Sequence, residues 1–463
     1  MLMGNSERTQ PVASDDAAAK ESERVESSDG AAAQATSKAA EAKLWTPYFI
    51  LIVAIMFCSY VSFHGLNSGT SVYIERTGGT ASFAGVLAAL YSIVAGIIRM
   101  IVGPIIDRRG RTIVMSAGAA SFTIGALIPG FLGSEPALVI GRILQGVGFG
   151  AITTSASTAA ADVLPAARMG EGLGYYGLGN ALAQSVGPAV ALALVVLDPP
   201  QTLFLALAVA AMVVFLLTML CNYERHPERL PEEASYRQQV ESGAFIPGKG
   251  STQPKPEKKE TLAERFFEPH ALPGAVPMVF VSAANGFSVF FAGVYGETLG
   301  IGNAGLYFTC AAVTMVLVRL KSKAYMDRTL PILVLTSGCG VGIAGLAMLL
   351  LAPMFPPLFY LAGFCYGFEL GVNLPTNQTV AVKNTPPERW GAGNALFLVA
   401  SDIGVSCTCI LWGILNDAIG FWAAITGALC CLILADVSAW IIYPQFAKNK
   451  KAHDEFEAKR QGK

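Results

Sequence analysis

The sequence alternates long apolar runs with short polar turns. A helix of about 20 apolar residues is long enough to cross the ~30 Å hydrocarbon core of a bilayer. The pattern predicts twelve such helices, over residues 47–66, 83–105, 113–133, 137–160, 172–197, 202–222, 274–296, 304–322, 331–352, 357–381, 392–414 and 420–443. The predicted fold is therefore an all-α membrane protein with twelve transmembrane helices.

The composition agrees with a membrane protein. Hydrophobic residues make up 53% of the chain and charged residues only 14%, whereas a soluble domain carries about 25% charged residues. The formal net charge of −1 gives no general attraction to nucleic acid, and no nucleic-acid partner is predicted. The nine cysteines lie in apolar runs without a C-x-x-C pair, so we expect packing residues and neither a metal site nor a cofactor.

Basic residues in the short loops predict the orientation. Lys and Arg gather in one set of turns, around Arg108, Arg168, Lys321 and Lys383, whereas the opposite set holds only Arg76. Basic loops stay on the cytoplasmic side of a membrane. We therefore predict a multi-pass protein of the cell (cytoplasmic) membrane, with both termini in the cytoplasm.

The polar segments divide the chain into five parts. We expect a disordered cytoplasmic tail over 1–43, because its Ala, Ser, Glu and Asp residues bury little surface. A six-helix bundle over 44–222 is followed by a cytoplasmic linker over 223–273, with a short surface helix expected near 262–267. A second six-helix bundle occupies 274–445, and a cytoplasmic tail occupies 446–463.

An internal repeat supports two similar halves. At offsets of 220 to 222 residues, charged residues, proline and glycine recur in the same order. Arg99 and Asp107 correspond to Arg319 and Asp327, and Pro165 corresponds to Pro386. Two parallel repeats imply a pseudo-two-fold axis along the membrane normal and a central site between the halves.

Three motifs then identify a family. The segment Gly103-Pro-Ile-Ile-Asp-Arg-Arg-Gly-Arg111 resembles the loop between helices two and three of the major facilitator superfamily. Residues 138–148 resemble its helix-four motif, and the run ending in Gly187-Pro188 resembles the helix-five motif of its antiporters. The pair of glycines that usually follows Gly-Pro is absent. The similarity covers about residues 45–445 and is strongest to bacterial drug- and metabolite-efflux members, including opine-metallophore exporters.

The resemblance assigns a gate to the charged turn. Ion pairs there would hold the two halves together in one state and release them in the other. The gate candidates are Gly103, Asp107, Arg108, Arg109, Gly110 and Arg111, with Asp327 and Arg328 as the second-half equivalent. The arginines also fit a simpler interpretation, as positively charged anchors on the cytoplasmic side.

Two carboxyl groups are candidates for proton coupling. Glu369 and Asp402 lie near the middle of the tenth and eleventh spans, where an ionisable residue is costly and indicates function. A carboxyl group far from water is less costly when protonated, and gaining and losing a proton is what coupling requires. The alternatives are a hydrogen bond to a facing Ser or Asn, or a packing ion pair with Arg319 or Lys383. By resemblance, Arg142 lies near the proton path, although a snorkelling arginine is also consistent.

The resemblance places the substrate cavity between spans 1, 4, 7 and 10. The polar residues expected there are Asn67, Thr154, Asn285, Tyr295, Tyr366, Asn373 and Asn377. Aromatic candidates are Tyr60, Phe63, Phe287 and Phe291.

These observations predict a secondary active transporter that exports a small organic solute in exchange for protons. A proton symporter or uniporter that imports a metabolite, and a non-transporting sensor on the same scaffold, are the alternatives. Enzyme chemistry is not expected, because the sequence has no Ser/His dyad, H-E-x-x-H motif or nucleotide loop. The expected partners are the solute, protons and the lipid bilayer, and the chain is expected to be a monomer.

Overall fold

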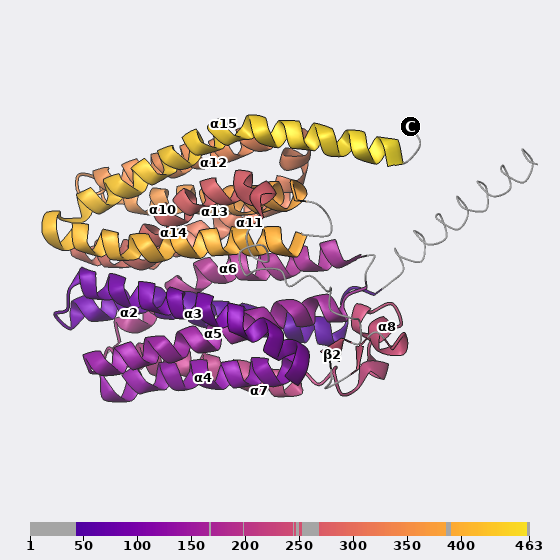
Figure 1. Cartoon of the computed structure of the whole chain (residues 1–463). Helices are drawn as coiled ribbons and strands as arrows, with labels where there is room; N and C mark the ends of the chain where they lie inside the picture. Colours follow the sequence, from indigo (N-terminus) through magenta and orange to yellow (C-terminus); the bar gives the residue numbers. More distant parts are fainter. Residues whose placement is uncertain are drawn as a thin grey trace, which may run out of the picture.

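The computed structural model describes residues 43–165, 168–197, 199–243, 245–246, 250–251, 268–385 and 390–460. In these residues the chain forms twelve long helices that run roughly parallel or antiparallel to one another (Figure 1). The prediction of an all-α fold with twelve long helices is confirmed.

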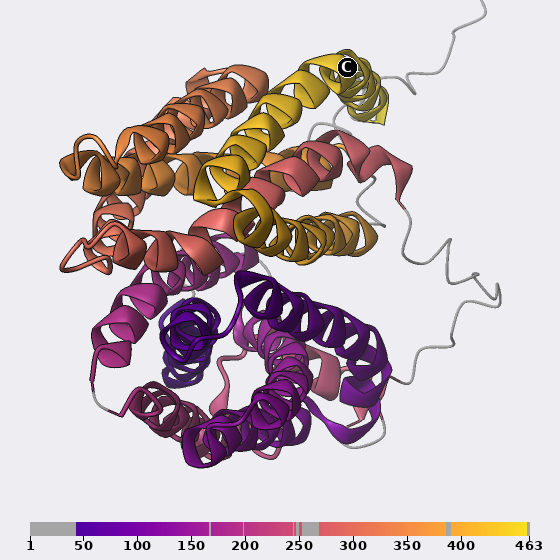
Figure 2. The same cartoon turned by 90° about the vertical axis from the view of Figure 1, so that its left-hand side faces the viewer.

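The first six long helices are α2 (Pro47–Arg76), α3 (Ala81–Arg109), α4 (Arg111–Leu132), α5 (Glu135–Val163), α6 (Met169–Val195) and α7 (Thr202–Leu220). The other six are α10 (Leu272–Thr298), α11 (Leu306–Arg328), α12 (Pro331–Leu351), α13 (Pro357–Lys383), α14 (Trp390–Ile419) and α15 (Phe421–Arg460). Seen along the helix axes, the two sets form two separate groups that meet along one seam (Figure 2). At this seam α3 packs against α14, α6 against α11, and α2 against α10.

Local sequence signals explain several helix ends. Thr46 and Thr80 precede α2 and α3, and their side-chain oxygens each accept a hydrogen bond of 3.2 Å from the amide three residues later. Gly110 separates α3 from α4 with a φ of 93°, a conformation that glycine adopts without strain. The charged turn of the sequence is therefore a single-residue break between two helices.

The segment after α7 contains short elements on one end of the bundle. These are the 3-10 turn η2 (Pro227–Arg229), helix α8 (Ser235–Glu241), the antiparallel strands β1 (Phe245–Ile246) and β2 (Gly250–Ser251), and the turn η3 (Pro269–Ala271). Helix α8 packs against α5, and the amide of Ser235 donates to the carbonyl of Leu164 over 3.1 Å. The surface helix expected near 262–267 and the tail before residue 43 lie outside the described residues. The five-part division of the chain stays a prediction.

Ten of the helices in the described chain are long and apolar enough to cross a membrane. Helix α11 contributes a shorter apolar stretch, Leu306–Arg319. Helix α13 is long but interrupted by polar residues, among them Glu369, Asn373 and Asn377. A polar helix within an apolar bundle marks α13 as an element to inspect for function.

Candidate functional site

One end of the seam is closed by contacts between the two halves. We call it the Arg76 end, after the residue that ends α2. Arg76 donates two hydrogen bonds of 2.9 Å to the carboxylate of Glu297, and a third to the carbonyl of Val195. Beside this pair, the carboxylate of Asp417 accepts hydrogen bonds from the amides of Ala81 and Ser82. A carboxylate of α14 thus caps the start of α3 in the other half.

A second ion pair crosses the seam deeper in the bundle. Arg99 of α3 pairs with Asp402 of α14. The Arg99 guanidinium lies 5.7 Å from the centre of the Phe149 ring of α5, so it faces the interior of the bundle. The two side chains nevertheless keep 25% and 37% of their surface exposed.

The seam loosens around this pair. Nearer the Arg76 end, α3 and α14 touch so closely that a Cβ added at Gly85 or Gly413 would collide with the opposite backbone. A Cβ added at Gly96, three residues before Arg99, or at Gly103, one turn beyond it, would contact nothing. The cross-seam contacts described above lie at the Arg76 end and at the depth of Arg99.

At the opposite end, which we call the Gly110 end, the charged groups are tied within one half. Arg111 forms a buried ion pair of 2.9 Å with Asp162, and Tyr223 donates to the same carboxylate over 2.8 Å. Glu224 accepts hydrogen bonds from the amides of Arg111 and Thr112, at the start of α4. The first residues after α7 therefore hold the charged turn in place.

Burial also fixes the protonation of two tyrosines in this cluster. It raises the pKa of the Tyr223 hydroxyl well above its usual value, and the charges of Asp162 and Glu224 add to the effect. Burial and the charge of Glu224 raise the pKa of the Tyr236 hydroxyl to about 12, although the positive charge of Arg111 lowers it in part. Both hydroxyls therefore remain protonated at neutral pH, and Tyr223 remains a donor to Asp162.

The predicted gate residues are only partly covered by the structure. Arg111 is buried and Arg109 is exposed. The side chains of Asp107, Arg108, Asp327 and Arg328 lie outside the described part of the chain. A gate that joins the halves at this turn stays a prediction.

Arg142 is held entirely by neutral groups. Its guanidinium donates to Asn67 Oδ1 (2.7 Å), to the carbonyl of Leu66 (3.0 Å) and to Gln145 Oε1 (3.3 Å), and it lies over the Tyr91 ring. No carboxylate is among its hydrogen-bond partners in the described residues. Its predicted effect on a coupling carboxyl group stays a prediction.

Glu369 belongs to a polar cluster inside the second half. It is 1% exposed, and Asn373 donates to its Oε1 over 3.1 Å. A void of about 10 Å³, enough for one water molecule, lies beside Glu369 and is also lined by Asn285, Ser288, Tyr307 and Tyr366. Glu369 and Asp402 therefore occupy different places, because Asp402 lies on the seam and does not line this void.

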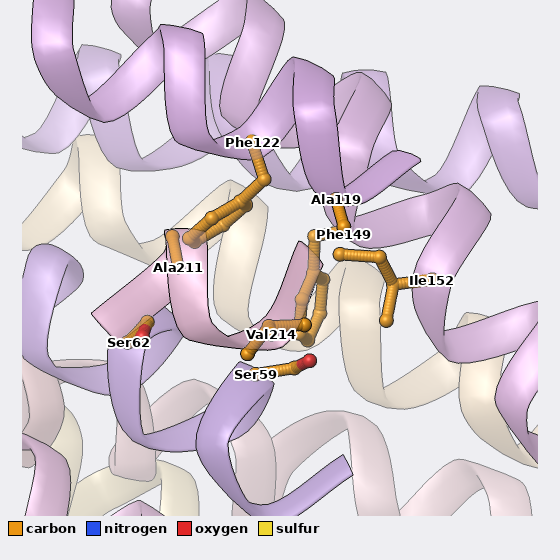
Figure 3. A pocket seen from close by; sticks show the side chains of 8 residues that line it. All are labelled: Ser59, Ser62, Ala119, Phe122, Phe149, Ile152, Ala211 and Val214. Atoms are coloured by element: carbon orange, nitrogen blue, oxygen red, sulfur yellow. The ribbon is translucent and has the colours of Figure 1, made fainter. Parts of the chain in front are cut away.

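The first half has an apolar void that is too small for a water molecule. Eight side chains line it, namely Ser59, Ser62, Ala119, Phe122, Phe149, Ile152, Ala211 and Val214 (Figure 3). At the repeat offset of 221, Glu369 corresponds to Gly148, and at 220, Gly342 corresponds to Phe122. Replacing phenylalanine by glycine on one helix leaves room for a glutamate on its neighbour.

The remaining predicted residues lie apart from these clusters. Thr154 bonds back to the carbonyl of Gly150, and Tyr295 donates to Leu349 while its ring packs against Phe421. Asn377 is buried, and its side-chain atoms have no hydrogen-bond partner among the described residues. Contacts of these residues with a solute stay predictions.

In the helix-five motif, a Cβ at Gly187 would lie 2.6 Å from the carbonyl of Val61. The glycine before Pro188 therefore allows α6 to approach α2.

Three contacts were not predicted from the sequence: Arg76 with Glu297, Asp417 with the start of α3, and Glu224 with the start of α4. For the first, two signals were present. Arg76 is the lone basic residue in its set of loops, and the repeat aligns Glu75 with Glu297. The other two link residues more than 100 positions apart, for which a single sequence holds no signal.

Comparison with known proteins places this geometry in a family. The chain is 24% identical over 416 residues to the staphylopine export protein of Staphylococcus aureus, covering 85% of this chain and 95% of that protein. It is 24% identical to the multidrug resistance protein MdtL of Escherichia fergusonii, over 76% and 84% of the two chains. The predicted similarity to bacterial efflux proteins is confirmed.

The fold matches a bacterial homolog of the human lysosomal transporter Spinster, solved in an inward-facing, unoccupied conformation. The TM-score is 0.66 at 14% identity, over 88% of this chain and 99% of that one. The sequence pattern of the Major Facilitator Superfamily matches residues 52–408. The chain therefore belongs to the Major Facilitator Superfamily and is a multi-pass membrane transporter rather than an enzyme.

Proposed function

We propose that this transporter exports a small organic solute in exchange for protons, by alternating access between its two halves. The observation that carries the proposal is the uneven seam. It is latched at the Arg76 end and is looser around Arg99 and Asp402, where a Cβ at Gly96 or Gly103 would contact nothing. Such a state receives a solute from the Gly110 side, which the basic loops assign to the cytoplasm. The similarity to two export proteins supports the same direction.

Two carboxyl groups in different surroundings support proton coupling. Asp402 has an arginine partner across the seam, so it is stable as a charged carboxylate. Glu369 is buried with a neutral amide as its hydrogen-bond partner, which makes a bare charge costly there. Protonation of Asp402 would remove the charge that holds Arg99, and thereby weaken a contact between the halves. A proton is thus linked to the movement that transport requires.

The chain supplies both sides of this seam, so we propose that it acts as a monomer. The single-chain contacts Arg76–Glu297 and Arg99–Asp402 join the halves without a second copy.

Everted membrane vesicles with an acidic interior test the proposal. They are offered a pool of polar metabolites extracted from the producing cells, and mass spectrometry records what accumulates. We expect accumulation with the native protein that collapses when the pH gradient is dissipated. Glu369→Gln and Asp402→Asn should abolish gradient-driven accumulation, whereas Ser62→Ala in the apolar void should leave it intact.

Two outcomes contradict the proposal. Full pH-driven accumulation by both carboxyl variants would exclude these groups from coupling. Accumulation in right-side-out vesicles alone would favour the alternative of an importing symporter or uniporter.

A further inference from the structure

We propose that Arg99 and Asp402 form the recognition pair for a zwitterionic solute, one that carries a carboxylate and an ammonium group together with an apolar side group. The inference rests on the proposed function, because it names the class of solute that enters the loosened seam. The pair lies where the closed part of the seam ends, so a solute entering from the Gly110 end would meet it.

Both charges have capacity left for a ligand. The contact uses one guanidinium nitrogen of Arg99, Nη1, and one carboxylate oxygen of Asp402. An arginine has five N–H donors in a planar fork that matches a carboxylate, and an aspartate accepts through both oxygens. With 25% and 37% of the two side chains exposed, neither side chain is fully enclosed.

Two other buried charges are not available in this way. Arg142 is 2% exposed and already donates to three neutral oxygens. Glu369 is 1% exposed and lies against Asn373 inside the second half. Among the charged side chains described at this depth, Arg99 and Asp402 thus offer one cation and one anion side by side.

An aromatic surface adjoins the cation. The Phe149 ring lies under the Arg99 guanidinium, and it stacks on Phe63 at 4.0 Å and meets Tyr60 edge-on at 5.1 Å. Phe149 itself is buried, whereas Tyr60 and Phe63 beside it are only partly buried. This surface suits an apolar or aromatic side group of the solute, because aromatic rings contribute large contact area.

Binding would exchange one ion pair for two. The solute carboxylate would take the fork of Arg99, and its ammonium group would take Asp402. A solute with one of these groups would satisfy one partner and leave the other with a weakened contact. A buried site binds a ligand much more weakly when that ligand leaves one of the site's polar groups unpaired.

Three probes of similar shape test the inference: L-phenylalanine, phenethylamine, which lacks the carboxylate, and 3-phenylpropionate, which lacks the ammonium group. Binding to the purified full chain in lipid nanodiscs is measured by calorimetry, at one pH and without a gradient. We expect phenylalanine to bind at least ~10-fold more tightly than either analogue. Arg99→Gln and Asp402→Asn should each remove that advantage.

The repeat provides a matched control. Arg319→Gln changes the arginine that corresponds to Arg99 in the second half and should leave the preference unchanged. Since a single variant at the seam can also disturb the fold, the double variant Arg99→Asp with Asp402→Arg restores both charges in exchanged positions. It should regain at least part of the preference for phenylalanine.

The inference is overturned if phenylalanine binds no more tightly than phenethylamine and 3-phenylpropionate. It is also overturned if the Arg99→Gln variant keeps the full preference for phenylalanine. These results are separate from those of the coupling experiment. If phenylalanine binds preferentially but no solute accumulates with the pH gradient, only the proposed proton coupling is contradicted. If a solute accumulates but phenylalanine has no preference over its analogues, only the proposed recognition of a zwitterion is contradicted.

Discussion

The two ends of the bundle are held by different kinds of contact. At the Arg76 end, Arg76 and Glu297 join the two halves, with 33% and 23% of their side chains exposed. At the Gly110 end, Arg111 and Asp162 join helices of the same half, with 6% and 9% exposed. In the proposed alternating access, one pair bridges the parts that move relative to each other, and the other lies within a part that moves as a unit.

The difference follows from what each contact must do. A contact across the seam has to break in every cycle, so exposure to water, which limits an ion pair to about 0–1 kcal/mol, is an advantage there. A contact within one half never has to break, and burial makes its loss costly. We therefore expect changes at the Gly110 end to lower folding stability, and changes at the Arg76 end to shift the balance of conformations.

The largest effect is expected for Asp162→Asn. The change leaves the buried Arg111 without its counter-charge and removes a charged acceptor for Tyr223. Breaking one partner of a buried pair typically costs about 3–5 kcal/mol. Thermal unfolding in detergent should show the loss, with Arg109→Gln, at an exposed position of the same turn, as the unaffected control. Equal stability of both variants would remove the distinction between the two ends.

A medium effect is expected where α3 packs against α14. Gly85→Val places a side chain against the backbone of Cys409, and overpacking of this kind costs about 1–3 kcal/mol. The closed seam should lose population, whereas Gly103→Val, in open space on the same helix, should not change it. Spin labels at Glu135 and Met354, one in each half, report the separation of the Arg76 end. The labels are introduced as unnatural amino acids, because the chain has nine cysteines. Similar distances in the two variants would contradict a seam that tightens toward one end.

The sequence predicts the fold well because crossing a membrane imposes one simple pattern. The twelve apolar runs agree with the twelve long helices, but α2 extends ten residues past its predicted end at 66. Residues 67–71 include Asn67, Ser68, Thr70 and Ser71, and this polar stretch resembles a loop. In the structure it is helical and buried, and Asn67 accepts from Arg142. The prediction therefore ended this helix too early because the following residues are polar. In the structure, one of these polar residues makes a hydrogen bond inside the bundle.

The candidate site is predicted less completely. Depth along a helix was enough to single out Glu369 and Asp402, because ionisable residues are rare in apolar spans, whereas Arg142 was singled out by the family resemblance. Their partners depend on how helices rotate and pack, which one sequence does not specify. Asp402, for instance, pairs with Arg99 rather than with the alternatives Arg319 or Lys383 on helices of its own half.

The smallest effect is expected at the pair that closes the Arg76 end. Arg76→Gln removes the two hydrogen bonds to Glu297. Because an exposed ion pair contributes about 1 kcal/mol, its loss should shift the population roughly fivefold toward conformations with an open Arg76 end. Glu75→Gln is the matched variant with the opposite sign, because the Glu75 carboxylate repels Glu297 and its neutralisation should favour closure. The same label distances at positions 135 and 354 measure both variants, and added salt should shrink the difference between them, as it screens partly exposed charges. If Arg76→Gln instead lowered thermal stability as much as Asp162→Asn, the Arg76 pair would have to be counted as part of the fold and not as a latch between the halves.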